Sequence, residues 1–506
     1  MATPVRDSYS ATSGQNIHGG RIGPGAASSI TLTDITQPVL QRVGTSKTVN
    51  VQVAYTGSPT AIQVRAVDYD SGAPITAWTS TTGTPTGGTA SVPLVIPQGK
   101  NYRLQSRDSV NTALTSNGTM RFGVGIINLN CGQSNAYNSY NTADKYPTTD
   151  AKSTFEWDKA NGIFRRSGHI PVPDTFPKNS LYPTNYTSYV TPNSANKGDG
   201  PIFWGNIVSD ALGVPVLNVL LAVSGSSIDQ WMPPTPPATN CWTNVVNALA
   251  AIGGDAEHVT WHQGEQNALG MTKATYAGKL ATLHANFMSA VGRTSSNFKM
   301  GIMAVGVGPY NGSTPGQFGN IRAAHVEYGN STAGAYLMST AHDGYTGSSD
   351  TVHLEKTSLS KIWRRAGKTT AYQYGVGTSG AGPRITGATR SGTTVTVAIA
   401  HSGGSSLQDG AGGTGGALTG FQFFDAGAAG AEIAYTSAIV GNTIVLTLAS
   451  APVGALTMSF AMQDAPHGTP TSQGFTPASC VYDNATYLNS GTLGCPLQPC
   501  AAITVS

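Results

Sequence analysis

A serine at the end of an apolar run is the first residue whose surroundings could support chemistry. Residues 126–140 read IINLNCGQSNAYNSY, so Ser134 directly follows a strand-like segment. A serine hydroxyl attacks a carbonyl carbon only when a positioned base removes its proton and an acid orients that base. Taken alone, Ser134 is a turn or cap residue, so its assignment depends on partners elsewhere in the chain. Cys131, which belongs to the apolar run, is interpreted as a buried small side chain.

The base and its orienting acid are predicted in the sequence DTVH at 350–353. An Asp three residues before a His on a loop can place its carboxylate at the imidazole Nδ1, which leaves Nε2 for the serine. We therefore assign Asp350 and His353 to these roles. His342 and Asp343 form a rival pair, but Asp-x-x-His before the last predicted helix fits better. The short Asp-to-His spacing also argues against a degenerate nucleophile elbow of the α/β-hydrolase kind.

Donors for an oxyanion are predicted at three strand ends. The backbone N–H of Ser134 is the first, and Gly225 in the stretch VSGSS offers a second backbone N–H at close approach. Gln263 in the stretch WHQGE supplies a side-chain amide as the third. Glu265 is interpreted as a supporting residue that holds Gln263, with a catalytic acid as the alternative, and Asn135 is a second supporting residue.

Aromatic side chains follow the serine within residues 135–199, a loop-rich insertion. Tyr137 and Tyr140 lie directly after the serine motif and are predicted to stack on a sugar. The alternative, packing of these rings onto the domain, stays open.

The elements that position these residues are alternating strands and helices over 121–376. Apolar strand candidates RFGVGIINL, VPVLNVLLAV, HVTWH, KMGIMAVGV and AYLMST are separated by helices expected near 200–212, 240–252, 272–292, 318–328 and 357–373. This alternation is typical of a doubly wound parallel sheet, here of five strands and flavodoxin-like. Ligands of such sheets bind beyond the carboxyl ends of the strands, where the candidate residues fall.

The flanking regions are predicted to be β-sandwiches. Residues 1–30 are polar and aperiodic and are interpreted as a tail or attachment segment, whereas 31–120 contain short alternating runs bounded by turn clusters. The β pattern returns over 377–506, where a carbohydrate-binding role is a further hypothesis.

Four blocks, GQSN, SGSSIDQW, WHQGE and DTVH, occur in this order. Together they resemble the sialate O-acetylesterase and acetylxylan-esterase branch of the SGNH hydrolases. The resemblance covers 121–376 and implies a serine esterase without a metal or organic cofactor. The roles that it implies fall on Ser134, Gly225, Gln263, Asp350 and His353.

Composition narrows the class of protein further. Charged residues make up 10% of the 506 residues, against roughly 25% in an average soluble domain. The net charge is +3 without a basic stripe, which argues against nucleic acid as a partner. No apolar stretch is long enough for a membrane span, and the first residues lack the apolar core of a secretory signal.

The cysteine count is odd, and three of the five cysteines, Cys480, Cys495 and Cys500, lie near the end of the sequence. One disulfide is plausible among these three. Their spacing lacks C-x-x-C pairs with nearby His, so a zinc site is not predicted.

The sequence thus favours a serine esterase that removes O-acetyl groups from a glycan or polysaccharide. The low charge and the Gly- and Thr-rich β regions favour an extracellular or virion-associated protein, such as a phage tail fibre or spike that deacetylates capsule or O-antigen. The sequence leaves open whether the protein forms a homo-oligomer or is a component of a virion. The alternative function is a non-catalytic carbohydrate-binding adhesin or receptor-binding protein on an esterase-like scaffold.

Overall fold

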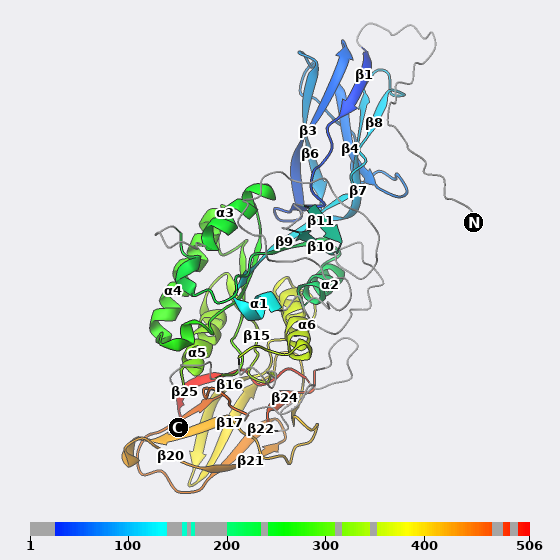
Figure 1. Ribbon diagram of the computed structural model, residues 1–506. Coiled ribbons are helices and arrows are strands. Elements are labelled where there is room, and N and C mark those ends of the chain that lie inside the picture. Colours follow the sequence, from blue (N-terminus) through cyan, green and yellow to red (C-terminus); the bar gives the residue numbers. More distant parts are fainter. Residues whose placement is uncertain are drawn as a thin grey trace, which may run out of the picture. The chain divides into compact units, whose positions relative to one another are not determined.

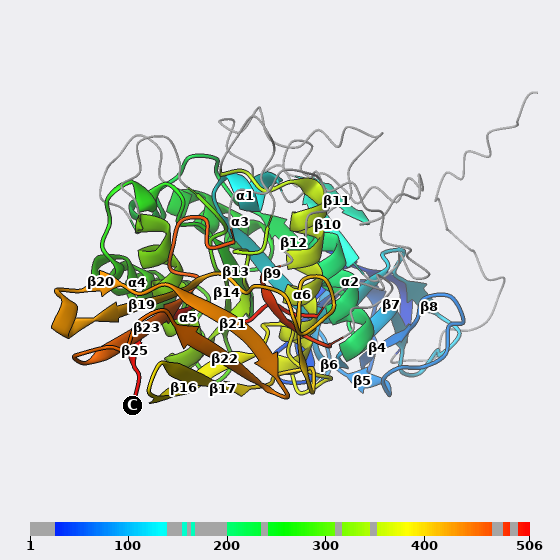
Figure 2. The ribbon, with the colours of Figure 1, turned by 90° about the horizontal axis from the view of Figure 1, so that it is seen from below.

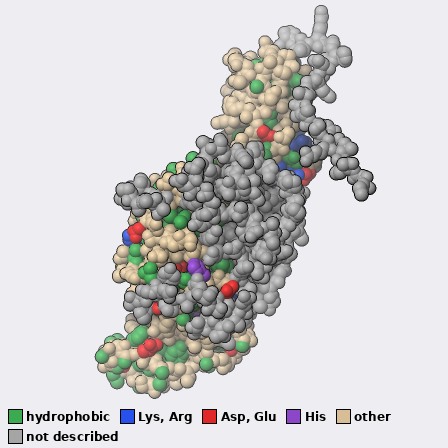
Figure 3. Space-filling view, viewed as in Figure 1, with side chains coloured by type: hydrophobic (Ala, Val, Ile, Leu, Met, Phe, Trp, Pro, Cys, Tyr) green, Lys and Arg blue, Asp and Glu red, His purple; other side chains and the backbone are tan. Residues whose placement is uncertain are grey.

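The computed structural model describes residues 26–138, 154–158, 163–166, 200–233, 241–308, 316–344, 352–467, 479–485 and 494–506. The chain forms two compact units. The first unit contains 1–35, 48–96 and 103–120, and the second contains 36–47, 97–102 and 121–506. On the face shown in Figure 3 the described surface carries few charged side chains, as the composition requires.

The first unit is built from β-strands. A three-stranded sheet has the order β1-β3-β6, and its strands are β1 (Ala27–Leu32), β3 (Ser46–Gly57) and β6 (Thr89–Pro97). The remaining strands are β4 (Ile62–Asp68), β5 (Thr79–Ser80), β8 (Thr115–Asn117) and the larger part of β7 (Gly99–Asp108), whose residues 99–102 belong to the second unit. In β6 buried and exposed residues alternate along the strand, which is the pattern of a sheet with one face in a core.

The second unit contains a mainly parallel sheet with the order β11-β10-β12-β9-β13-β14-β15. The strands are β9 (Phe122–Gly132), β10 (Thr154–Asp158), β11 (Ile163–Arg166), β12 (Val216–Leu220), β13 (His258–His262), β14 (Lys299–Met303) and β15 (Ala335–Ser339), and short β2 (Val39–Gln41) pairs with β9. All five predicted strands are present as parallel neighbours. The sheet is larger than predicted because parallel β10 and antiparallel β11 extend one edge.

Helices lie on both faces of this sheet. They are α2 (Gly200–Leu212), α3 (Cys241–Ala251), α4 (Lys273–Ala290), α5 (Gln317–Ser331) and α6 (Lys356–Gln373), which confirms the five helices expected from the sequence. Figures 1 and 2 show α3, α4 and α5 on one face and α2 and α6 on the other. Because both faces are covered, β9, β12 and β13 are buried along their whole length. No described helix is both long and apolar enough to span a membrane.

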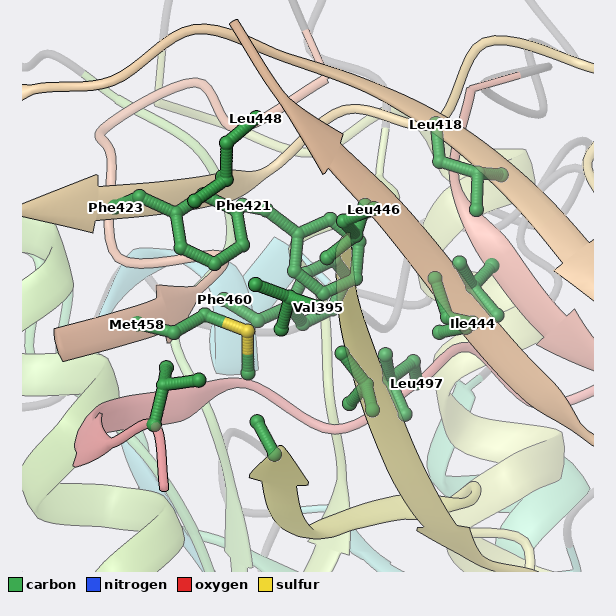
Figure 4. Packing of buried hydrophobic residues seen from close by; sticks show 14 of the residues in the cluster. Val395, Leu418, Phe421, Phe423, Ile444, Leu446, Leu448, Met458, Phe460 and Leu497 are labelled. Atoms are coloured by element: carbon green, nitrogen blue, oxygen red, sulfur yellow. The ribbon is translucent and has the colours of Figure 1, made fainter. Parts of the chain in front are cut away.

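The C-terminal part of the second unit consists of antiparallel sheets. One contains β16 (Arg384–Ser391), β17 (Thr394–Ala400), β22 (Thr443–Leu448) and β21 (Tyr435–Val440), and another contains β20 (Ala431–Glu432), β19 (Phe421–Asp425), β23 (Leu456–Phe460) and β25 (Cys500–Thr504). A two-stranded sheet joins β18 (Leu407–Asp409) to β24 (Val481–Asp483). Both four-stranded sheets contribute to one apolar core, in which Val395 and Leu446 meet Phe421 and Phe460 (Figure 4).

Candidate active site

The serine motif lies at the point where the strand order of the parallel sheet reverses. The chain runs from β9 to β12 on one side and then crosses to β13 on the other side of β9. Such a switch point leaves a crevice beyond the carboxyl ends of the strands. Ser134 follows β9 and Gln263 follows β13, so both lie at the carboxyl edge of the sheet where this rule places a ligand.

Gly132 allows the turn that carries Ser134 out of the sheet. Its φ is 145°, and a Cβ built on it would lie 2.0 Å from the carbonyl oxygen of His262 on the neighbouring strand. The next residue, Gln133, donates its backbone N–H to the same carbonyl at 3.0 Å. A side chain at position 132 would therefore separate β9 from β13 just below the serine.

Ser134 is the first residue of the short helix α1 (Ser134–Asn138). It is 7% exposed, and no hydrogen bond to its hydroxyl occurs within the described part of the chain. A nearly buried hydroxyl without a partner among the described residues is available to a substrate, and catalytic hydrogen bonds are often long before substrate binds.

Asn135 joins the loops that carry the other candidate residues. Its Nδ2 donates to Oε1 of Glu265 at 2.6 Å and to the carbonyl oxygen of Val352 at 3.1 Å. Its Oδ1 accepts the backbone N–H of Leu354 at 3.0 Å. The two backbone contacts flank His353, so the residue next to the serine fixes the loop of the predicted base.

Asp350 and Tyr140 lie outside the described residues, and the side chain of Tyr137 is not described either. The predicted orienting acid and sugar-binding rings therefore stay predictions. His353 is partly exposed and lies close enough to Glu265 to interact with its charge.

The rival pair His342 and Asp343 is engaged elsewhere. Asp343 accepts two hydrogen bonds from Arg365, at 2.8 and 2.6 Å, and a third from Tyr482 at 3.1 Å. Burial by itself raises the pKa of Asp343, but the ion pair with Arg365 outweighs it and holds this pKa below its usual range. His342 contacts His467 rather than any residue of the serine motif.

Glu265 is a buried carboxylate at the centre of the loop contacts. Burial raises its pKa, while the hydrogen bond from Asn135 and the charge of His353 act in the opposite direction. Its Oε2 has no hydrogen-bond partner among the described residues. Its side chain accepts a hydrogen bond from Asn135, so Glu265 supports the loop of His353 rather than Gln263, the residue that the sequence suggested it would hold.

The predicted oxyanion donors differ in availability. Gly225 is exposed, has a φ of 70° and has open space beside its Cα. Gln263 is fully buried, and its Nε2 donates to oxygens of Gln133, Ser226 and Asn267 at 2.9, 3.0 and 2.6 Å. The amide group has only two hydrogens, so these three acceptors leave none for a further partner. The geometry thus gives Gln263 a bracing role, and its donation to an oxyanion stays a prediction.

Sequence reasoning missed the residues that brace the strand ends. Gln133 accepts the backbone N–H groups of Gly264 and Gln266 at 3.2 and 3.1 Å, which ties the serine block to the loop after β13. Ser226 accepts the indole N–H of Trp231 at 3.0 Å, so Trp231 orients the Gly225 loop. The amide and hydroxyl residues within the motifs were a signal for this bracing.

Two neighbours of the motifs belong to the core. Cys131 is fully buried and its pKa is raised well above the usual thiol value by burial, so it is a poor nucleophile. His262 is also fully buried, and burial lowers its pKa to about 4, which keeps the ring neutral at neutral pH.

Comparison with known proteins gives the class of the chain. Residues 180–373 match the family described as carbohydrate esterase, sialic acid-specific acetylesterase. This match contains Gly225, Gln263 and His353 but begins after Ser134. No curated protein sequence matches the chain significantly.

A fold similar to that of this chain occurs in a solved structure with a TM-score above 0.5. A carbohydrate acetylesterase from Xanthomonas citri is 17% identical, with a TM-score of 0.57, over 92% of this chain and 97% of that one. A carbohydrate acetylesterase from Sinorhizobium meliloti is 13% identical, with a TM-score of 0.27, over 50% of this chain and 99% of that one. Residues 180–373 therefore match a carbohydrate-esterase family, and the chain shares the fold of a carbohydrate acetylesterase. The protein is a carboxylic ester hydrolase.

Proposed function

We propose that this esterase removes O-acetyl groups from a carbohydrate and that Ser134 is its nucleophile. The observation that carries the assignment is the set of hydrogen bonds of Asn135, which fix the backbone on both sides of His353 next to the serine. The family match over the loops of Gly225, Gln263 and His353 supports the same reaction.

The proposed reaction passes through an acetyl-enzyme. His353 accepts the proton of Ser134 as Oγ bonds to the acetyl carbon, and Asp350 orients the imidazole. The N–H groups of Ser134 and Gly225 stabilise the oxyanion. The intermediate then expels the sugar oxygen, which takes the proton from His353. Water, deprotonated by His353, releases acetate and restores Ser134.

A chromogenic acetate ester tests the nucleophile. Ser134→Ala should lower kcat/KM by at least about 10³-fold, because removing a nucleophile leaves only binding and oxyanion stabilisation. Ser289→Ala, at an exposed serine on α4, is the matched control and should keep full activity. Equal activity of wild type and Ser134→Ala would refute the assignment. Organophosphate labelling of another residue would do the same.

The proposal also covers the arrangement of the domains and the biological context in which the enzyme acts. We propose a five-stranded SGNH core flanked by two β-sandwiches, in a phage tail fibre or spike that acts on capsule or O-antigen. The low charged fraction and the antiparallel C-terminal sheets support it. Acetate release from a panel of acetylated polysaccharides identifies the substrate. If simple esters are cleaved but no polysaccharide releases acetate, the proposed action on capsule or O-antigen is refuted, whereas the proposed esterase activity is not.

A further inference from the structure

A cluster of two histidines and a cysteine lies away from the serine motif, where the parallel sheet meets the C-terminal sheets. His342 follows β15, His467 follows β23 and Cys480 precedes β24. One ligand atom from each residue lies within 4.8 Å of those from the other two, and all three residues are buried. The two histidines are 125 positions apart, so only the fold brings them together.

The hydrogen bonds around the cluster fix the tautomers of both rings. Nε2 of His342 lies 2.9 Å from the carbonyl oxygen of Leu497, which can only accept, so Nε2 carries the hydrogen. Nδ1 of His467 lies 3.1 Å from the hydroxyl of Thr419, which donates its own hydrogen to Ser479 at 2.8 Å. Nδ1 of His467 therefore carries the hydrogen as well.

The remaining two ring nitrogens face each other with lone pairs. Nδ1 of His342 and Nε2 of His467 are 3.0 Å apart. Two facing lone pairs repel each other, and a cation between them removes that repulsion.

We propose that His342, His467 and Cys480 bind a transition metal ion, with Zn²⁺ the best match to two imidazoles and a thiolate. Each histidine donates its outer ring N–H to an oxygen, which is the arrangement that orients metal-binding imidazoles. Zn–N and Zn–S bonds of about 2.0 and 2.3 Å place N and S about 3.5 Å apart. Because the ligand atoms already lie within 4.8 Å of one another, the N–S distance shortens by at most about 1.3 Å. The thiol proton of Cys480 leaves to solvent as the Zn–S bond forms.

The ion would join two parts of the second unit. His342 belongs to the parallel-sheet region, whereas His467 and Cys480 belong to the C-terminal sheets. Binding would thus add a link between these regions that is independent of ester hydrolysis. A chelator should then lower the melting temperature of the protein.

Metal analysis of the tag-free, reduced full-length protein tests the site. Wild type offered Zn²⁺ should hold about one ion per chain, and Co²⁺ should give a thiolate charge-transfer band. Cys480→Ser should lose both the ion and the band, while Cys495→Ser, at a buried cysteine outside the cluster, should keep them. Thr419→Val removes an outer hydrogen bond and should weaken binding by about 10- to 100-fold.

Two results would overturn the proposal. One is a wild-type protein that binds none of Zn²⁺, Co²⁺ and Cu⁺, which would leave a proton as the cation between the rings. The other is equal metal content in wild type and Cys480→Ser. If Cys480→Ser does not fold, the affinity of Thr419→Val decides, and a wild-type affinity there would contradict the site.

Discussion

Asn135 shows how one side chain organises the candidate site. Three hydrogen bonds connect it to Glu265, Val352 and Leu354, which belong to two other loops. All three hydrogen bonds are buried, so the loss of each would cost more stability than the loss of a surface contact. The position of His353 relative to Ser134 therefore depends on the residue that follows the serine.

Replacing Asn135 by Ala should lower kcat by about 10²-fold, because a displacement of about 1 Å in a catalytic group has that effect. KM should change little, since Asn135 contacts loops rather than a bound acetyl group. Steady-state kinetics with a chromogenic acetate ester measure both constants. A variant that melts like wild type and keeps wild-type kcat would contradict this role.

Glu265 makes the stability of the protein depend on pH. Burial raises its pKa in the folded state, so its contribution to stability is fully present below the ordinary value of 4.5 and is lost as pH rises through the folded pKa. Glu265→Gln keeps an oxygen for Asn135 and removes the charge. It should melt higher than wild type at pH 7, and the gain should vanish towards pH 4.

The activity of Glu265→Gln should fall, although its melting temperature at pH 7 should rise. The carboxylate of Glu265 interacts with the charge of His353, so its loss should lower kcat even in a more stable protein. Melting curves from pH 4 to about 8 and kinetics at pH 7 measure the two effects. Glu432→Gln, at an exposed glutamate, should change neither. A gain in melting temperature that is the same at every pH would disprove the titration argument.

At the scale of elements, a buried polar network connects three strands and two helices of the parallel sheet. His258 on β13 contacts Asn128 on β9 at 2.8 Å and the hydroxyl of Tyr336 on β15 at 2.7 Å. Tyr336 in turn contacts Thr370 on α6 at 2.7 Å, and Trp204 on α2 donates to the same threonine. The network fixes the register of the strands that end at the site.

Tyr336→Phe should destabilise the protein by about 1–3 kcal/mol, because Nε2 of His258 loses its partner in a buried position. Burial lowers the pKa of His258 to about 3, so the loss should be the same from pH 5 to about 8. Urea unfolding measures it. Tyr372→Phe, at an exposed tyrosine on α6, is the control, and an equal effect of the two changes would contradict the network.

At the scale of the whole second unit, Arg322 on α5 joins the two kinds of sheet. It is fully buried and donates to the carbonyl oxygens of Val305 and Gly306 after β14. It also donates to those of Ala461 and Gln463 after β23. Burial lowers its pKa to about 10, which still leaves it charged at neutral pH.

Arg322→Met should destabilise the second unit by about 3 kcal/mol and make the C-terminal sheets more sensitive to protease, because buried carbonyl oxygens lose a charged donor. Arg322→Lys should not restore stability, since an ammonium lacks the planar fork of a guanidinium. Limited proteolysis with mass spectrometry measures the change. Arg390→Met, at an exposed arginine, is the control, and equal protease resistance of the two variants would contradict the link.

The sequence by itself determined the parallel strands, the helices and the four motif blocks. Their signals are local: apolar runs buried on both faces, helical periodicity and polar residues directly after strands. The topology rule that strand ends meet at one edge then placed Ser134, Gly225 and Gln263 in one region. Strands β10 and β11 escaped prediction because they lie within an aromatic and amide-rich segment without a long apolar run.

Only the tertiary structure decided which side chains touch. It turned the amide of Gln263 inward onto Gln133, gave Asn135 the contacts that flank His353, and placed Asp343 with Arg365 rather than in the site. It also brought His342 and His467 together beside Cys480, where the sequence predicted no metal ligands. These pairings depend on hydrogen bonds and burial between positions far apart in the chain, and local patterns carry no information about them.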